Sequence, residues 1–351
     1  MASQPSFVQR IRWYATIYAI RLLVQLQKLI LNNLATTKPN YIKTYAILPT
    51  IQNNIFLPPS WKKGDPPLPL LIDIHGGGFT IGAPAVDNRD NRLLASYGIC
   101  VVSIGYRLAP AHKFPGPVHD VALLINAVLA DADLPIDKTK VAIAGYSAGG
   151  NLALAAPQLD NLHTRIKGVV AYYPSTDVGR PLSKRLETAV APAKRKDVLI
   201  RMSPMFRWAY LPGKKENLDV DADADVDADV DVDVDDPLLA PLKADRRTVC
   251  EKVYVLGCEC DLLCTEAEEA AEAYAEADRM MGRSGPRVEL RGGGRVGWRE
   301  GNVTWEKLMG MEHGFNQRLV VVRGEEKKLW QRRMVEMHKN VAEWLFREVY
   351  V

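Results

Sequence analysis

Strand-like and helix-like segments alternate along the chain from Leu68 onward. A strand that runs parallel to its predecessor needs a crossover of a dozen or more residues, usually a helix, and such helices cover both faces of the sheet. The sequence therefore predicts an α/β fold with a mostly parallel central sheet and helices on both faces. The predicted strands are Leu70–Ile74, Ile99–Ile104, Val141–Ala144, Ile166–Tyr172, Lys252–Leu256 and Arg287–Leu290, the last at an edge; the helices are Asp87–Tyr97, Val118–Ala130, Ala148–Leu159, Glu266–Met281 and one after Gly324.

The length of the chain favours a large main domain with an appendage. It has 351 residues, more than the ~250–300 at which a single hydrophobic core stops growing. The content of 47% apolar and 25% charged residues is that of an ordinary globular protein. The net charge of +3 is too small to indicate a nucleic-acid partner. We predict an N-terminal segment over residues 1–64 and the main domain over residues 65–351.

The N-terminal segment is basic and begins with an apolar helix. Residues 1–64 contain eight Lys or Arg and no Asp or Glu, and residues 7–34 contain neither Pro nor Gly. Arg21 and Lys28 interrupt the apolar run, so the segment is a poor bilayer-spanning helix. Three interpretations stay open for residues 7–34: a helical cap packed over a site, an interfacial membrane helix, and a signal anchor or targeting peptide.

Two segments interrupt the main domain. Residues 217–236 alternate Asp with Val or Ala, with ten Asp between Asp219 and Asp236, and a strand there would align like charges on one face. We predict a disordered acidic insertion, with weak calcium binding as the alternative. Residues 291–301 are rich in glycine and predict a second flexible loop.

The cysteines favour a reducing compartment. The chain is long and has five cysteines, an odd number, so a secreted disulfide framework is not expected. We expect a cytoplasmic location. Cys258, Cys260 and Cys264 are spaced C-x-C-x3-C and have no fourth ligand nearby, whereas structural zinc takes four. We predict free thiols and no metal.

Two glycine-rich motifs follow predicted strands. Gly145-Tyr146-Ser147-Ala148-Gly149 fits G-x-S-x-G, in which a sharp strand-to-helix turn exposes a serine hydroxyl. His75-Gly76-Gly77-Gly78 follows the strand Leu70–Ile74 and offers backbone N–H groups to a substrate. The amides of Gly77, Gly78 and Ala148 would form an oxyanion hole. A phosphate-binding loop is disfavoured because no helix starts directly after Gly78 and no Gly-Lys-Ser/Thr follows.

With the segment Tyr106-Arg107-Leu108-Ala109-Pro110, these motifs resemble the hormone-sensitive-lipase-like branch of the α/β-hydrolases. The resemblance covers the chain from about Leu68 to the C-terminus, apart from the two insertions. It implies the α/β-hydrolase fold with an N-terminal helical cap, and a serine carboxylesterase or lipase activity without a cofactor. Two residues depart from the family pattern: Tyr146 stands where Asp is frequent before the serine, and Ala111 stands where Glu is frequent.

A serine nucleophile needs a base and an orienting acid, which follow it in this fold in the order Ser, acid, His. His313, in a loop before the last helix, matches the family's His-Gly-Phe pattern and is the predicted base, rather than His163 or His338. Asp261, just beyond the strand Lys252–Leu256, is the predicted acid, with Glu259 as its rival. His75 and Gly76 are predicted to support the oxyanion loop.

These expectations describe a serine ester hydrolase that acts on a small or medium apolar ester. Two other classes stay open: a catalytically inactive, ligand-binding member of the same fold, and a membrane-surface interaction protein whose N-terminal helix is the functional part. Peripheral membrane contact through residues 7–34 and a homodimer are also left open.

Overall fold

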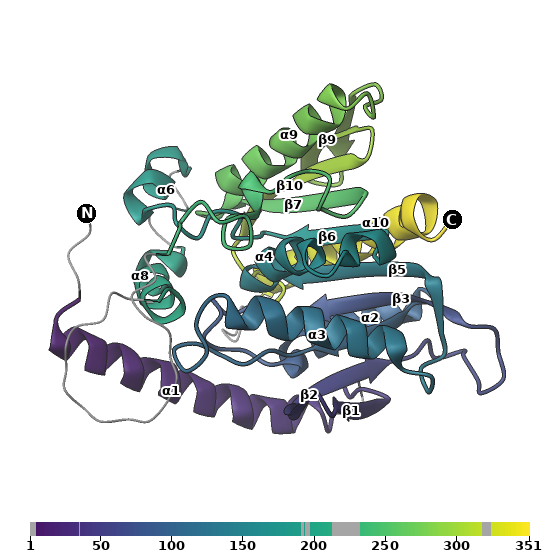
Figure 1. The fold of residues 1–351 in the computed structure, drawn as a ribbon, viewed down its shortest axis with the longest axis horizontal. Helices are drawn as coiled ribbons and strands as arrows, with labels where there is room; N and C mark the ends of the chain where they lie inside the picture. Colours follow the sequence, from purple (N-terminus) through teal and green to yellow (C-terminus); the bar gives the residue numbers. More distant parts are fainter. Residues whose placement is uncertain (1–4, 35, 191–192, 194–196, 213–231, 318–323) are drawn as a thin grey trace.

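The computed structural model describes residues 5–34, 36–190, 193, 197–212, 232–317 and 324–351. Figure 1 shows a central sheet with helices packed on both sides. The sheet has ten strands in the order β1-β2-β4-β3-β5-β6-β7-β10-β9-β8. The six strands from β4 to β10 in that order are parallel, and the pairs outside them are antiparallel. The predicted fold class is therefore confirmed.

The elements have the following bounds. The strands are β1 Tyr41–Tyr45, β2 Leu48–Phe56, β3 Leu68–Ile74, β4 Cys100–Ile104, β5 Ile136–Tyr146, β6 Gly168–Tyr172, β7 Lys252–Cys260, β8 Val288–Gly292, β9 Arg295–Glu300 and β10 Val303–Glu312. The helices are α1 Phe7–Leu31, α2 Asn88–Ser96, α3 Gly116–Ala130, α4 Ala148–Ala155, α5 Leu162–Arg165, α6 Leu182–Thr188, α8 Leu199–Tyr210, α9 Cys264–Met280 and α10 Gly324–Trp344.

Alternate residues of the central strands point to two separate cores. On β3, Leu70 and Ile72 belong to the core under α3, α4 and α9, whereas Leu71 belongs to the core under α2 and α10. This alternation is what a strand with both faces buried requires. Strands β4 and β6 are buried throughout, and β3 is buried from Leu70 to Ile74, as expected.

The predicted boundary near residue 64 is wrong. Strands β1 and β2 lie within residues 1–64 and pair into the main sheet, where β2 runs antiparallel to β4 through Asn54 and Ser103. These strands carry polar residues such as Asn53 and Asn54 among the apolar ones, so they lack the continuous apolar run by which the central strands were recognised. Only α1 and the turn after it precede the sheet.

The prediction of a flexible loop over residues 291–301 is also wrong. Residues Arg295–Glu300 form β9, which pairs with β8 on one side and β10 on the other. The glycines Gly292, Gly293 and Gly294 form the hairpin turn and all have positive φ, a conformation that suits glycine. Most of the predicted acidic insertion, residues 217–231, lies outside the described residues.

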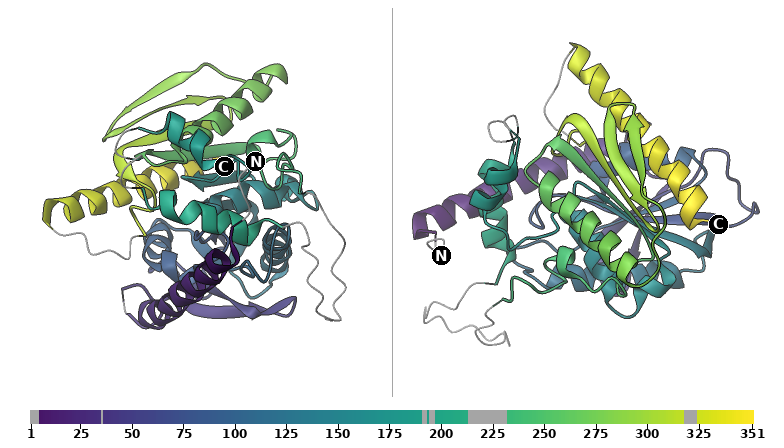
Figure 2. Two further views of the ribbon diagram at one scale, coloured as in Figure 1. Left: turned by 90° about the vertical axis from the view of Figure 1, so that its left-hand side faces the viewer. Right: turned by 90° about the horizontal axis from the view of Figure 1, so that it is seen from above.

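Helix α1 lies along one side of the molecule beside α8 (Figure 1). Trp13 and Tyr14 contact the Trp208 ring of α8, with ring centroids 5.3 and 5.1 Å apart. Arg21 donates hydrogen bonds to the carbonyls of Thr80 and Ala109, in the loops that follow β3 and β4. The N-terminal helix therefore packs against α8 (Figure 2) and against the loops that follow β3 and β4. It also has the length and composition of a helix that could cross a membrane.

Candidate active site

Ser147 lies on a sharp turn between β5 and α4. Its φ of 55° and ψ of −114° are a strained backbone conformation for a residue with a side chain. The turn is possible because two glycines allow close contact: a Cβ on Gly145 would lie 2.1 Å from the Gly149 carbonyl, and one on Gly149 would lie 2.2 Å from the Ile74 carbonyl. The Gly-x-Ser-x-Gly pattern is thus required sterically, and it presents the serine at the carboxyl edge of the sheet.

The structure brings the three predicted triad residues together. His313 Nε2 lies 2.9 Å from Ser147 Oγ, and His313 Nδ1 lies 2.8 Å from Asp261 Oδ2. Because an ionised carboxylate can only accept hydrogen bonds, this arrangement places a proton on Nδ1 and leaves Nε2 to accept the serine proton. Asp261 is buried, and its second oxygen accepts a hydrogen bond from the Leu263 amide.

Parallel pairing of β7 and β10 explains why Asp261 and His313 meet. The last residues of the two strands, Cys260 and Glu312, are in register, so the residues that follow them leave the sheet side by side. The imidazole of His313 also packs edge-on against Tyr173, with ring centroids 5.0 Å apart. Backbone register and ring packing together hold the imidazole in position.

The predicted oxyanion loop follows β3. Gly78 has a φ of 57°, and a Cβ there would overlap the Phe206 ring at 2.2 Å. Gly78 and Ala148 both line the pocket that contains Ser147, whereas the adjacent Gly77 does not line it. The Gly77 carbonyl accepts hydrogen bonds from the Thr80 and Ile81 amides and so fixes the turn.

His75 and Gly76 support this loop. The His75 ring stacks on Tyr106, and its Nδ1 lies 2.8 Å from the Gly76 carbonyl oxygen. Burial lowers the pKa of His75 to about 4, so the ring is neutral near pH 7 and donates a hydrogen bond to that carbonyl. A Cβ on Gly76 would lie 2.9 Å from the Tyr146 carbonyl, so the oxyanion loop packs directly on the serine turn.

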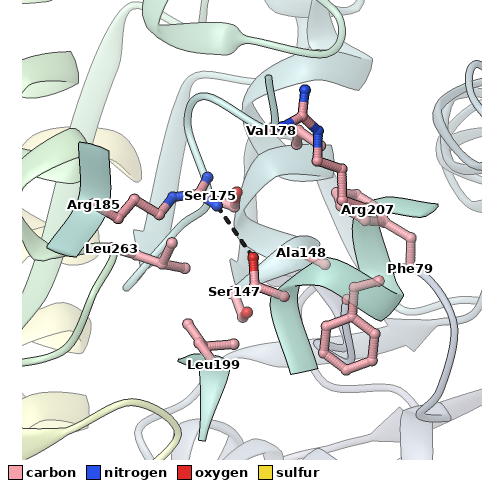
Figure 3. Close-up of a pocket in the computed structure, with 12 residues that line it drawn as sticks. Phe79, Ser147, Ala148, Ser175, Val178, Arg185, Leu199, Arg207 and Leu263 are labelled. Carbon is pink, nitrogen blue, oxygen red and sulfur yellow. Dashed lines mark hydrogen bonds between the residues drawn. The ribbon is translucent and has the colours of Figure 1, made fainter. Parts of the chain in front are cut away.

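A pocket with a free volume of about 50 Å³ opens at Ser147 (Figure 3). Its walls are mostly apolar, but two arginines, Arg185 and Arg207, also reach it. In the view of Figure 3 they lie above Ser147, while Leu199 and Phe79 lie below it. The remaining lining residues are Gly78, Ala148, Ser175, Val178, Ser203, Phe206 and Leu263. The arrangement can hold a small acyl compound with its carbonyl beside the serine.

Sequence reasoning missed Asp197. Its Oδ2 accepts a hydrogen bond of 2.7 Å from the Leu262 amide, next to Asp261 in the chain, and its Oδ1 accepts one from Leu199. Burial and then the charge of Asp261 raise the pKa of Asp197 to about 6, against a lowering effect of His313. The sequence carries no signal for it, because it lies outside every recognisable motif and strand.

The rejected candidates lie elsewhere or have other partners. Glu259 accepts a hydrogen bond from the Gly310 amide, and His163 lies on the short helix α5. His338, expected to be a surface or packing residue, is fully buried and lies 2.9 Å from Asp90. All five cysteines are free thiols. Within the described ranges, no group of three or more His, Cys, Asp or Glu side chains could hold a metal ion.

Comparisons with known proteins agree with this architecture. Residues 71–282 match a family described as having the α/β-hydrolase fold. The chain is 30% identical over 234 residues to an arylesterase of Saccharolobus solfataricus, covering 65% of this chain and 67% of the relative. It is 31% identical to a carboxylesterase of Mycobacterium tuberculosis over 48% of this chain, but spans only about half of that relative, 52%.

The fold is similar over the whole chain to a solved esterase structure. An esterase of Pyrobaculum calidifontis superposes with a TM-score of 0.69 at 22% identity, covering 99% of this chain and 100% of the other. The resemblance stated from the motifs is confirmed by these matches. The chain belongs to the α/β-hydrolase family, among its esterases.

Proposed function

We propose that the protein is a serine carboxylic-ester hydrolase that works through an acyl-serine intermediate. The observation that carries the proposal is the continuous contact from Asp261 through His313 to Ser147, with hydrogen-bond distances of 2.8 and 2.9 Å. A hydroxyl is a weak nucleophile until a base removes its proton, and this geometry supplies the base and its orienting acid. The esterase relatives support the same reaction class.

The proposed cycle has two acyl transfers. His313 takes the proton of Ser147 as Oγ attacks the ester carbonyl, and returns it to the leaving alkoxide, so that an alcohol departs and the acyl group stays on Oγ. Water then attacks the acyl-serine and loses a proton to His313, which passes that proton to Ser147 Oγ as the acyl–Oγ bond breaks and the carboxylic acid leaves. The amides of Ala148, Gly78 and Gly77 are the proposed oxyanion donors; losing one such donor costs roughly 3–4 kcal/mol in comparable sites.

The pocket supports a small or medium, largely apolar ester as substrate. Its free volume is about 50 Å³, well below the ~300–1,000 Å³ typical of sites for larger ligands, which favours a small acyl group beside Ser147. Phe79, Leu199 and Leu263 provide apolar walls. No cofactor takes part in the proposed steps.

Hydrolysis of 4-nitrophenyl acetate and butanoate by the full chain and by Ser147→Ala tests this proposal. We expect the wild type to hydrolyse both esters and the variant to lose that activity with its circular-dichroism spectrum unchanged. Ser96→Ala, at the surface end of α2, is the matched control and should behave as wild type. Equal hydrolysis by Ser147→Ala would exclude the mechanism. A folded wild type without activity would favour the inactive, ligand-binding alternative.

We further propose that the outer face of α1 binds a membrane surface. Seven apolar residues occupy one face at helical spacing and are 51–76% exposed: Phe7, Val8, Ile11, Tyr18, Leu22, Leu26 and Leu29. Contiguous apolar patches of this kind mark interaction sites. The flanking charges are all basic, since residues 1–64 contain no acid, and this favours anionic lipid over another protein copy. The free thiols support a location on the cytoplasmic side.

Flotation with liposomes of neutral or anionic lipid tests this contact. We expect the full chain to float with anionic liposomes, and a variant with Leu22→Gln, Leu26→Gln and Leu29→Gln to stay behind. The control is Met280→Gln, which replaces an apolar residue that is 81% exposed on α9, away from α1. Val24 on α1 is unsuitable for this purpose because it is buried, and glutamine there would disturb packing. If the triple variant floats as well as the wild type, the proposal is refuted. If the wild type self-associates in solution and the triple variant does not, the apolar face of α1 forms a homodimer instead.

A further inference from the structure

Two arginines reach the pocket beside Ser147, and their surroundings differ. Arg185 is buried and donates hydrogen bonds to both carboxylate oxygens of Glu266, at 2.7 and 3.2 Å, and to the Asp177 carbonyl at 2.7 Å. Its charge is therefore neutralised and its donors are largely used. A residue placed in this way maintains the shape of the pocket and contributes little free charge to it.

Arg207, on α8, has no such partner. Among the residues that the structure describes, its guanidinium forms no hydrogen bond and has no carboxylate within the ion-pair distance of 4.0 Å. Asp177 attracts it from farther away, but that carboxylate is paired with Arg180 at 3.3 Å. Guanidinium carries five N–H donors that match a carboxylate in a bidentate arrangement. Arg207 can therefore accept an anion without losing an existing contact.

The electrostatic surroundings also favour an anion at this position. Arg207 is half-buried, and burial lowers its pKa, with the neighbouring Arg185 lowering it further and Asp177 opposing the shift. A cation that has lost part of its hydration and faces a second cation is stabilised when a negative group arrives. Hydrogen bonds to charged groups in such a partly enclosed site are also stronger than in open water.

Nothing in the proposed hydrolysis of a neutral ester uses this guanidinium. Arg207 lies on α8, whereas the nucleophile, the base and the oxyanion loop follow β5, β10 and β3. Yet Arg207 lies in the same pocket as Ser147, one residue from Phe206, whose ring packs on the oxyanion loop at Gly78. We propose that Arg207 is a specificity-determining residue that selects esters carrying a carboxylate on the part of the substrate held in this pocket. The inference rests on the proposed ester hydrolase activity.

Matched pairs of esters test this selection. Mono-4-nitrophenyl adipate against 4-nitrophenyl hexanoate places the carboxylate on the acyl side, and 4-acetoxybenzoate against its methyl ester places it on the alcohol side. We expect kcat/KM for the anionic member of one pair to exceed that of its neutral partner at least tenfold, after subtraction of the rate with Ser147→Ala. High salt should reduce this ratio, since it screens partly exposed charges.

Variants at position 207 separate charge from shape. Arg207→Gln should lower the anionic-to-neutral ratio about 10–100-fold, and Arg207→Lys, which keeps the charge without the bidentate geometry, should restore part of it. Arg201→Gln, exposed on the same helix and outside the pocket, is the control and should keep the wild-type ratio. A ratio that does not change in Arg207→Gln would overturn the inference.

Binding distinguishes failure of this inference from failure of the proposed function. In Ser147→Ala protein, calorimetry should detect monomethyl adipate, and adding Arg207→Gln should weaken that binding at least tenfold. If the wild type hydrolyses neutral esters but shows no such difference, only the charge selection is wrong. If it hydrolyses no ester yet binds the anion through Arg207, the hydrolase proposal is wrong, and the anion site stands.

Discussion

The molecule contains two buried carboxylate–imidazole pairs of nearly the same length. His313 Nδ1 lies 2.8 Å from Asp261, and His338 Nε2 lies 2.9 Å from Asp90. Both acids are buried, and both histidines lie in the C-terminal part of the chain. The difference is in the other ring nitrogen: that of His313 meets a serine hydroxyl at the edge of a pocket, whereas that of His338 lies 3.5 Å from the hydroxyl of Tyr172, inside the core.

A buried carboxylate–imidazole pair alone therefore does not make a catalytic site. Asp90 and His338 join α2 to α10 and, through Tyr172, to β6, under one face of the sheet. Both side chains lie inside the core, and the other ring nitrogen of His338 faces the buried hydroxyl of Tyr172. The Asp261–His313 pair sits where β5, β7 and β10 all end, so the same chemistry faces a substrate. We therefore expect mutations in the first pair, Asp261–His313, to change activity, and mutations in the second pair, Asp90–His338, to change stability.

The largest expected effect is on activity, in His313→Gln. Without an imidazole, the hydroxyl of Ser147 keeps its proton, and kcat for an aryl ester should fall about 10⁶-fold, as it does when a comparable triad loses its histidine. Steady-state assays with thermal denaturation in parallel would measure this. An intact activity in His313→Gln, or a similar loss in His338→Gln with the fold preserved, would remove the distinction between the two pairs.

Asp261→Asn should lower kcat about 10⁴-fold, because an amide no longer holds the imidazole in the tautomer that accepts the serine proton. Asp90→Asn is its counterpart in the second pair. We expect that variant to keep wild-type kcat per folded molecule, measured by titrating active serines before the assay. The account would be contradicted if Asp90→Asn reduced kcat as strongly as Asp261→Asn.

His338→Gln should reduce the free energy of unfolding by about 3–5 kcal/mol, because it leaves the Asp90 carboxylate without its buried partner. Urea unfolding followed by tryptophan fluorescence would measure the change. His119→Gln, exposed on α3, is the control and should differ from wild type by less than about 0.5 kcal/mol. A loss no larger than the control's would show that the second pair is not structural.

The smallest predicted effect is a pH dependence of the free energy of unfolding, caused by a buried acid beside the Asp90–His338 pair. Burial raises the pKa of Asp73 to about 6, above its usual 3.8, although Asn91 and Ser103 donate hydrogen bonds to it. A raised pKa in the folded state means that the contribution of Asp73 to stability is present at pH 3.8 and below and is lost as the pH rises to about 6.

Asp73→Asn removes that titration. Between pH 4 and pH 7, the stability of the wild type should therefore fall relative to that of the variant by about 2–3 kcal/mol, from a shift of about two pKa units. Urea midpoints measured across this range would give the difference. Parallel curves for the two proteins would mean that Asp73 has an ordinary pKa in the folded protein.

The sequence predicted well what depends on local pattern. The central strands were predictable because each is a continuous apolar run, and the serine turn was predictable because only glycine fits at Gly145 and Gly149. Asp261 followed from its position after a strand, and His313 from the chain order of a triad and the His-Gly-Phe pattern of the family that the motifs resemble. Each of these features is a consequence of neighbouring residues or of strand ends that must share one edge of a sheet.

What the sequence could not predict depends on contacts between distant segments. Strands β1, β2, β9 and β10 escaped recognition because polar residues or glycines interrupt them, and their pairing with neighbouring strands in the main sheet makes them strands. Asp197 and Arg207 became visible through tertiary contacts alone. The helical pattern predicts His338 as a surface or packing residue, and its burial against Asp90 follows from how α10 packs on α2.

Covalent labelling with a fluorophosphonate reports on the activation of Ser147 itself, because the reagent reacts with an activated serine by losing fluoride and forming a bond from Oγ to phosphorus. We expect one adduct, mapped by mass spectrometry to Ser147, which is lost in His313→Gln and formed at the wild-type rate in folded His338→Gln. An unlabelled Ser147 in the folded wild type, or labelling that does not depend on His313, would contradict the proposed mechanism.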